Sequence, residues 1–151
     1  MPDLPLLFNE LVRFETELWN ALDAQFRAEI DLPLGWFEAM RIVDEHPSCR
    51  VYDIADALAI TVGGTSKLVD RLEAAGHCRR RPNPEDRRSS IVELTESGYA
   101  LVAASRVVFD RELARRIEAV VPAAELDQLL RTLTRLRAAG HQLDPARKAT
   151  P

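Results

Sequence analysis

The chain has 151 residues, of which 46% are hydrophobic and 29% are charged, and two of them are cysteines. This length and composition fit one globular domain, or one domain with helical extensions, and two cysteines are too few for a disulfide framework. The first residues lack the basic region and long apolar core of a signal peptide, and no apolar run approaches the ~20 residues of a membrane helix. We therefore expect a cytoplasmic protein with no membrane partner.

Apolar residues at three- and four-residue steps predict a long first helix, from Leu6 to about Ile30. Its stripe is more apolar than a small core requires, so we expect it to serve as both core and dimer interface. The members are Leu7, Leu11, Phe14, Leu18, Leu22 and Phe26, with Trp19 beside them. A second helix is expected over residues 34–45, where Trp36 and Phe37 would fill the core or form the floor of a pocket.

A helix-turn-helix is predicted next. Residues 49–51 favour a short strand and residues 52–59 a first helix whose start has no good capping residue. Thr61 has the hydroxyl of an N-cap for the second helix, and Gly76 suits the left-handed residue that follows it. The other face of this helix begins with small and polar residues, as in a helix that enters a DNA groove, although it also fits a soluble helix with a loose first turn. The predicted buried face is Val62, Thr65, Leu68, Val69, Leu72 and Ala75.

A basic β-hairpin follows this helix directly. Residues 78–81 and 89–94 have the composition of strands, and residues 82–86 have that of a turn. Five arginines in ten residues repel one another unless an anion is near, and phosphate is the obvious anion. For an isolated hairpin we would favour a solvated loop balanced by Glu85 and Asp86, but after a helix-turn-helix we favour DNA. The five are Arg79, Arg80, Arg81, Arg87 and Arg88.

Two further helices are predicted after the hairpin. The first runs from Glu96 to about Val120 behind the cap Thr95, and the second from Pro122 to about Ala139. Residues 140–151 are expected to fray. A helix of ~25 residues spans ~37 Å, and its apolar stripe cannot be buried against a small winged unit alone. We therefore expect a two-fold homodimer, which would place two recognition helices ~34 Å apart.

The charge is distributed unevenly along the chain. The net charge is −4, which is unusual for a protein that binds DNA. Residues 1–61 carry −8, residues 62–88 carry +3 and residues 89–151 carry +1. The one clearly positive segment is therefore the predicted recognition helix with its hairpin, and the acidic remainder would limit nonspecific binding.

These residues resemble the MarR family of bacterial transcription regulators. The segment SKLVDRLEAAG is similar to the end of that family's recognition helix, and DRRSSIVELTESG fits its wing signature. The resemblance covers nearly the whole chain. It implies a mainly α fold with a small β-hairpin wing, a winged helix-turn-helix whose N- and C-terminal helices form the dimer. The positions that match the wing signature are Asp86, Arg88, Val92, Leu94, Thr95 and Gly98.

The resemblance also implies roles for individual residues. Arg88 would lie near the minor groove, Asp86 would orient the wing, and residues 62–67 would face the major groove. Many relatives carry polar or basic residues where Val62, Gly63 and Gly64 stand here. A small-molecule effector would bind between the dimer helices and the winged unit, in a pocket that we assign to Phe14, Trp19, Trp36 and Phe37. The predicted DNA-binding residues are Val62, Gly63, Gly64, Thr65, Ser66, Lys67, Arg71, Arg87 and Arg88.

We interpret the chain as a single domain over residues 1–151, with a winged unit at 34–98 and dimerisation helices at 6–30 and 99–140. The predicted function is that of a ligand-responsive repressor that binds an inverted-repeat operator in double-stranded DNA as a homodimer. An effector that prefers a dimer with another spacing of its recognition helices would release the DNA.

The alternative is a winged-helix protein-interaction module that has lost DNA binding, which the pair Gly63-Gly64 would favour. We expect no enzyme and no cofactor, because there is no catalytic triad and no nucleotide fingerprint. We also expect no metal site, and we expect both thiols to be structural. The four candidate zinc ligands have the spacing of no common site: His46, Cys49, His77 and Cys78.

Overall fold

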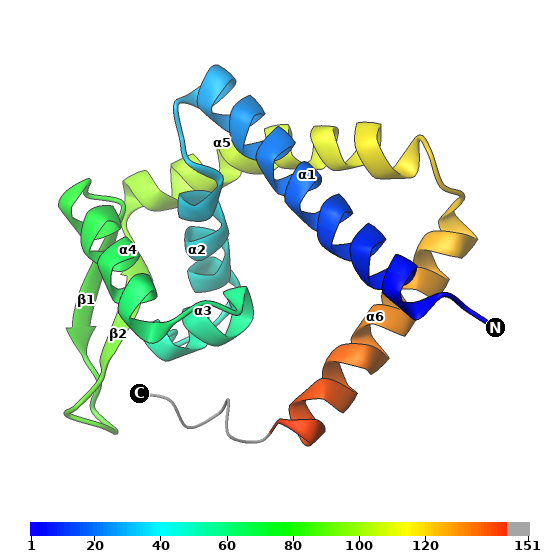
Figure 1. Cartoon of the computed structure of the whole chain (residues 1–151). Helices are drawn as coiled ribbons and strands as arrows, with labels where there is room; N and C mark the ends of the chain where they lie inside the picture. Colours follow the sequence, from blue (N-terminus) through cyan, green and yellow to red (C-terminus); the bar gives the residue numbers. More distant parts are fainter. Residues whose placement is uncertain (145–151) are drawn as a thin grey trace. The chain divides into compact units, whose positions relative to one another are not determined.

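The computed structural model of the chain describes residues 1–144 (Figure 1). The chain divides into two compact units, residues 1–109 and the residues from 110 onward. The first unit is mainly helical with one two-stranded antiparallel sheet, which confirms the predicted fold class. Within the described residues, no helix is both long and apolar enough to cross a membrane.

Helix α1 (Leu4–Ile30) begins two residues earlier than predicted. The reason is an N-cap that was not predicted, in which the Asp3 carboxylate accepts a hydrogen bond from the Leu6 backbone N–H at 2.9 Å. Only the C-terminal end of the predicted stripe is buried, at Leu22 and Phe26. Further toward the N-terminus its apolar side chains are exposed, among them Leu7, Phe8, Leu11 and Phe14. Helix α2 (Leu34–Glu45) has the predicted bounds.

Helix α3 (Val51–Leu58) starts one residue before its predicted position. Asp53 supplies the missing cap, because its carboxylate accepts a hydrogen bond from the Arg50 backbone N–H at 2.8 Å and also pairs with the Arg50 guanidinium. Since Val51 already belongs to α3, the predicted strand at 49–51 is reduced to a single bridge between Arg50 and Ile91.

Helix α4 (Val62–Ala74) is capped by Thr61, whose hydroxyl accepts a hydrogen bond from the Gly64 backbone N–H at 3.1 Å. Gly76 follows with a φ of 81°, in the left-handed region, as predicted. The predicted buried face is correct at Thr65, Val69 and Leu72, whereas Val62 and Leu68 are half-buried and Ala75 is exposed.

Strands β1 (Cys78–Pro82) and β2 (Ser90–Leu94) form the predicted hairpin. The pairing is antiparallel and places Arg79 opposite Glu93 and Arg81 opposite Ile91. Figure 1 shows that the tip of the hairpin extends away from the helices of this unit. Helix α4 contacts α3 and also β1, so the hairpin is packed against the second helix of the helix-turn-helix.

Helix α5 (Glu96–Leu113) begins behind Thr95, whose hydroxyl accepts a hydrogen bond from the Gly98 backbone N–H at 3.2 Å, as predicted. The helix does not continue regularly to Val120, because residues 114–118 form a π-helical turn. Helix α6 (Ala123–Leu143) runs past its predicted end at Ala139, so residues 140–143 are helical and do not fray. The remainder of the predicted frayed tail, 145–151, lies outside the described residues.

The core of the first unit is built around three phenylalanines. The ring of Phe37 in α2 lies 5.2 Å from that of Phe26 in α1 and 5.1 Å from that of Phe109 in α5. Phe26 and Phe37 have no exposed surface. Their burial fixes α1, α2 and α5 to one another, because aromatic rings of this size contribute most of the apolar area of a small core.

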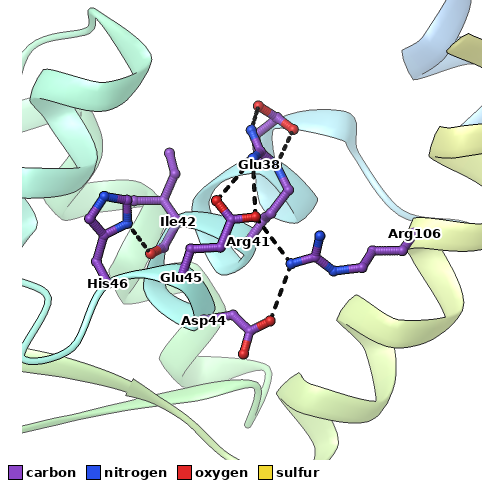
Figure 2. A network of polar contacts seen from close by, with 7 residues as sticks. All are labelled: Glu38, Arg41, Ile42, Asp44, Glu45, His46 and Arg106. Atoms are coloured by element: carbon purple, nitrogen blue, oxygen red, sulfur yellow. Dashed lines mark hydrogen bonds and ion pairs between the residues drawn. The ribbon is translucent and has the colours of Figure 1, made fainter.

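A network of charged side chains also joins α5 to α2 (Figure 2). The Arg106 guanidinium lies 3.3 Å from the Asp44 carboxylate and 3.2 Å from that of Glu45, and Arg41 bridges Glu45 to Glu38. Burial raises the pKa of Glu45, but hydrogen bonds from Arg106 and Arg41 outweigh it and leave this pKa below its ordinary value.

Candidate nucleic-acid interface

The N-terminal half of α4 presents a small and cationic surface. Gly63 and Gly64 are exposed, and a Cβ atom added at Gly63 would meet no atom within 4 Å. Lys67 and Arg71 are exposed on the next two turns, and neither has a hydrogen-bond or ion-pair partner among residues 1–144. A duplex could therefore approach the backbone of this helix closely, with two free cations beside it.

Thr65 does not belong to this surface, although it is among the predicted DNA-binding residues. It has no exposed area, and its hydroxyl donates a hydrogen bond to the Thr61 carbonyl at 2.8 Å. The side chain therefore lies in the core of the winged unit. The predicted positions that remain at the surface are Val62, Gly63, Gly64, Ser66 and Lys67, of which Val62 and Ser66 are half-buried.

The five arginines of the hairpin fall into two groups. Arg79 and Arg81 both pair with the Glu93 carboxylate on the opposite strand, and the Arg81 hydrogen bond is the main reason why the pKa of Glu93 lies below its ordinary value. Arg80 pairs with two carboxylates of α4, Asp70 and Glu73. The predicted repulsion among these three arginines is thus relieved by the protein's own carboxylates, not by an external anion.

Arg87 and Arg88 form the second group. Both are exposed in the turn of the hairpin, and within the described part of the chain their side chains have no partner. Asp86 shapes this turn, because its carboxylate accepts a hydrogen bond from the Arg88 backbone N–H at 2.9 Å. It contacts the backbone of Arg88 and leaves the guanidinium free for another anion.

A hollow of about 540 Å³ lies at the base of the turn. Its wall contains three arginines, of which Arg80 and Arg81 are paired with carboxylates and Arg87 has no partner within residues 1–144. The lining residues are Arg80, Arg81, Pro82, Asn83, Arg87, Ser89 and Ser90.

The four residues assigned to an effector pocket lie in different surroundings. Phe37 is fully buried in the aromatic core, whereas Phe14 and Trp19 are exposed on α1. Trp36 is half-buried, and its ring lies 6.5 Å from that of His77 at the end of α4. Phe37 is therefore a core residue, and the hollow at the base of the turn is lined by none of the four.

Both cysteines are buried. Burial raises the pKa of the thiols of Cys49 and Cys78 to about 11, in spite of the neighbouring arginines. At neutral pH they are thiols and not thiolates, and the thiolate is the form that reacts and binds metals. Within residues 1–144, no group of three or more histidine, cysteine, aspartate or glutamate side chains has the arrangement of a metal site.

The chain is similar to known proteins in both sequence and fold. The model of the MarR family matches residues 32–90. The uncharacterized HTH-type transcriptional regulator YfiV of Bacillus subtilis (strain 168) is 29% identical over 94 residues, which are 62% of this chain and 59% of YfiV. The chain thus spans about three fifths of the length of this relative.

Among solved structures, the chain is similar to Sco3205 of Streptomyces coelicolor, a MarR family transcriptional regulator in complex with DNA. The TM-score is 0.80 at 24% identity, and the match covers 91% of this chain and 87% of that chain. It is also similar to CouR of Rhodococcus jostii RHA1 bound to p-coumaroyl-CoA, with a TM-score of 0.76 at 22% identity, covering 89% and 91%. At these identities the matches establish the fold.

Proposed function

We propose that this chain is a transcriptional regulator of the MarR family, whose model matches residues 32–90, and that it binds an inverted-repeat operator in double-stranded DNA as a homodimer and represses transcription. The observation that carries the proposal is a set of four exposed cations on the winged unit. In the region that the structure describes, all four lack a partner, whereas the other arginines of the hairpin are paired with carboxylates. The four are Lys67, Arg71, Arg87 and Arg88.

The shape of the winged unit supports the same proposal. Helix α4 offers an exposed N-terminal half that is narrow enough for the major groove, and the hairpin carries its free arginines in the turn. Arginine at such a turn suits the negative potential of a narrow minor groove. Phosphate contacts from the four cations would position the protein, and the exposed positions of residues 62–67 would read the bases.

The experiment that tests this function is selection of bound duplexes from a random DNA pool, followed by a salt titration with the enriched sequence. We expect an inverted repeat with half-site centres ~10 bp apart, and an affinity that falls steeply as salt rises. If no sequence is enriched, or if all duplexes bind weakly and equally, the winged-helix interaction module becomes the better interpretation.

Replacing Arg88 by alanine is expected to weaken operator binding by ~1–3 kcal/mol and to make its salt dependence shallower. The reason is that Arg88 is exposed and has no partner in residues 1–144, so its whole charge is available to DNA. Fluorescence anisotropy at several salt concentrations measures both quantities. The matched control is Arg79→Ala, which removes the same charge from the same hairpin, but from a side chain paired with Glu93. Equal losses for the two variants would contradict a special role for the turn.

The homodimer is the second element of the proposal, and the apolar surface of α1 supports it. The Phe8 side chain is 65% exposed, and Leu4, Leu7 and Leu11 are exposed on the same helix. Isolated exposed apolar residues are common, but a run of them along one helix marks an interface. A second copy of the chain would cover this run by a two-fold contact.

We expect Phe8→Asp to weaken this dimer by roughly a hundredfold. The substitution removes an aromatic side chain that the dimer would bury, and it places a carboxylate in the interface. Light scattering coupled to size-exclusion chromatography at several protein concentrations gives the dissociation constant. Asn9→Ala, on the opposite face of α1, is the control and should leave it unchanged. A wild-type chain that is monomeric at micromolar concentration would contradict the dimer.

A small-molecule effector is the third element. Its support is the CouR structure, whose ligand is p-coumaroyl-CoA. The proposal for this chain is that an organic effector shifts the dimer toward a form whose recognition helices no longer match the half-sites. Trp19 and Phe14 on α1, together with Trp36, remain the proposed contacts, and Phe37 is left out because it belongs to the core.

A further inference from the structure

Arg80 makes contacts that set it apart from the other arginines of the hairpin. Its Nη2 atom lies 2.8 Å from Oδ1 of Asp70 and donates a hydrogen bond to the carbonyl oxygen of Ser66 at 3.3 Å. Its Nη1 atom lies 3.6 Å from Oε2 of Glu73, and its backbone N–H donates to the same oxygen at 3.0 Å. The Arg80 side chain is only 23% exposed, so these contacts are partly shielded from water.

The three partners of Arg80 lie on one face of α4. Ser66, Asp70 and Glu73 are spaced at i, i+4 and i+7, and together they cover about 10 Å of the helix axis. The first residue of β1 also contacts α4, since the Cys78 thiol donates a hydrogen bond to the Val69 carbonyl at 3.8 Å. Arg80 reaches further along the axis, to a residue of the segment expected to face the major groove.

The same contacts make Arg80 a poor phosphate ligand. A phosphate that binds Arg80 would have to displace charge-assisted hydrogen bonds that are already formed and partly buried. The side chains of Arg87 and Arg88 in the turn make no such bonds within residues 1–144. A displaced guanidinium would also leave Asp70 and Glu73 without their cation and close to DNA, where two carboxylates repel the backbone of the duplex.

We propose that Arg80 is a positioning residue, which holds α4 at a fixed rotation and axial position against β1 so that the recognition helix and the turn of the hairpin engage one duplex together. This inference rests on the proposed function. The charge of Arg80 therefore contributes to operator affinity through Asp70, Glu73 and the Ser66 carbonyl, and not through contact with phosphate.

Arg80→Gln tests the inference by binding. We expect affinity for the selected operator to fall by about tenfold, with little change in affinity for a random duplex and no change in the salt slope. Arg80→Lys should restore part of the loss, because an ammonium group reaches one of the carboxylates but lacks the two-pronged geometry. Arg88→Ala is the comparison, in which the slope does decrease. A smaller slope in Arg80→Gln, with equal losses on both duplexes, would overturn the proposal.

Asp70→Asn changes the ratio of operator to random-duplex affinity differently if Arg80 contacts phosphate than if Arg80 holds α4. If Arg80 contacts phosphate, removal of a competing carboxylate frees it and raises the ratio of operator to random-duplex affinity, or leaves that ratio unchanged. If Arg80 holds α4, the ratio falls, and Arg80→Gln adds little when made in the Asp70→Asn, Glu73→Gln background. A full additional loss in that background would also overturn the inference.

Amide hydrogen exchange of the free protein tests the contact without DNA. In Arg80→Gln we expect faster exchange in α4, around residues 66–71, and unchanged exchange in α5. Arg79→Gln is the control and should leave α4 unchanged, since its partner is Glu93. Unchanged exchange in α4 of Arg80→Gln would show that Arg80 does not hold the helix. If the wild-type chain selects no duplex, the proposed function fails, and the exchange result alone decides whether Arg80 holds α4.

Discussion

Phe37→Ala is expected to lower the free energy of unfolding by about 3–5 kcal/mol. The Phe37 ring has no exposed surface and lies about 5 Å from the rings of Phe26 and Phe109, which belong to two other helices. Truncation therefore removes a large buried apolar area and leaves a cavity at the point where α1, α2 and α5 meet. The two neighbouring rings are held on separate helices and can collapse into that cavity only in part, which places the cost in the upper half of the range for core substitutions.

Thermal unfolding measures this loss of unfolding free energy. The protein concentration must be fixed, because the stability of a dimer depends on concentration. For a chain of this length the expected decrease in Tm is about 10 °C. Phe37→Leu keeps most of the apolar volume and should lose less than half as much. Phe14→Ala removes the same side chain from an exposed site, so any loss it causes should depend on protein concentration through the proposed dimer. A small, ligand-reversible effect of Phe37→Ala would instead restore Phe37 to the effector pocket.

The elements of the winged unit could be predicted because their signals are local. Thr61 and Gly76 mark the ends of α4, and alternating residues in β2 mark the hairpin. Local signals did not predict which side chains are buried where the burial requires a second chain. The stripe of α1 is helical as predicted, yet half of it is exposed in the single chain, and periodicity alone does not state what covers it.

The arginines of the hairpin show the same limit for the site. Their composition predicted repulsion relieved by phosphate, but the register places Arg79 opposite Glu93. The pairing of Arg79 with Glu93 could have been predicted from the alternating pattern of β2, once a register of the two strands was assumed. The partners of Arg80 could not be found in this way, because the face that α4 turns toward β1 is set by tertiary packing.

Gly98→Ala is expected to destabilise the protein by more than about 3 kcal/mol, although it adds a single methyl group. A Cβ atom at Gly98 would overlap the carbonyl oxygen of His77 and would lie 3.1 Å from its carbonyl carbon and 3.3 Å from the Leu94 Cβ atom. The obstacle is backbone, which cannot rotate away as a side chain does. Glycine is therefore required at position 98 by the close approach of the His77 backbone. Its φ is helical, so the backbone conformation alone would accept any residue.

The backbone near His77 is also held by hydrogen bonds. The His77 carbonyl accepts a bond from the Thr95 backbone N–H at 3.1 Å, and the Thr95 hydroxyl donates to the Gly76 carbonyl at 2.6 Å. These bonds join the end of α4 to the start of α5. A methyl group at Gly98 must break them or displace the first turn of α5, and either change alters the position of α4 relative to the hairpin.

Thermal unfolding and operator binding measured together test this prediction. We expect Tm to fall by about 10 °C, and operator affinity to fall even at temperatures where the variant is fully folded. Gly35→Ala in α2 is the matched control, because the added methyl meets no atom within 4 Å and the residue lies outside the proposed DNA-binding surface. An unchanged Tm in Gly98→Ala would mean that residues 76–77 move away freely. The recognition helix would then be joined loosely to α5, and an effector bound to the dimer helices could not control its position through this junction.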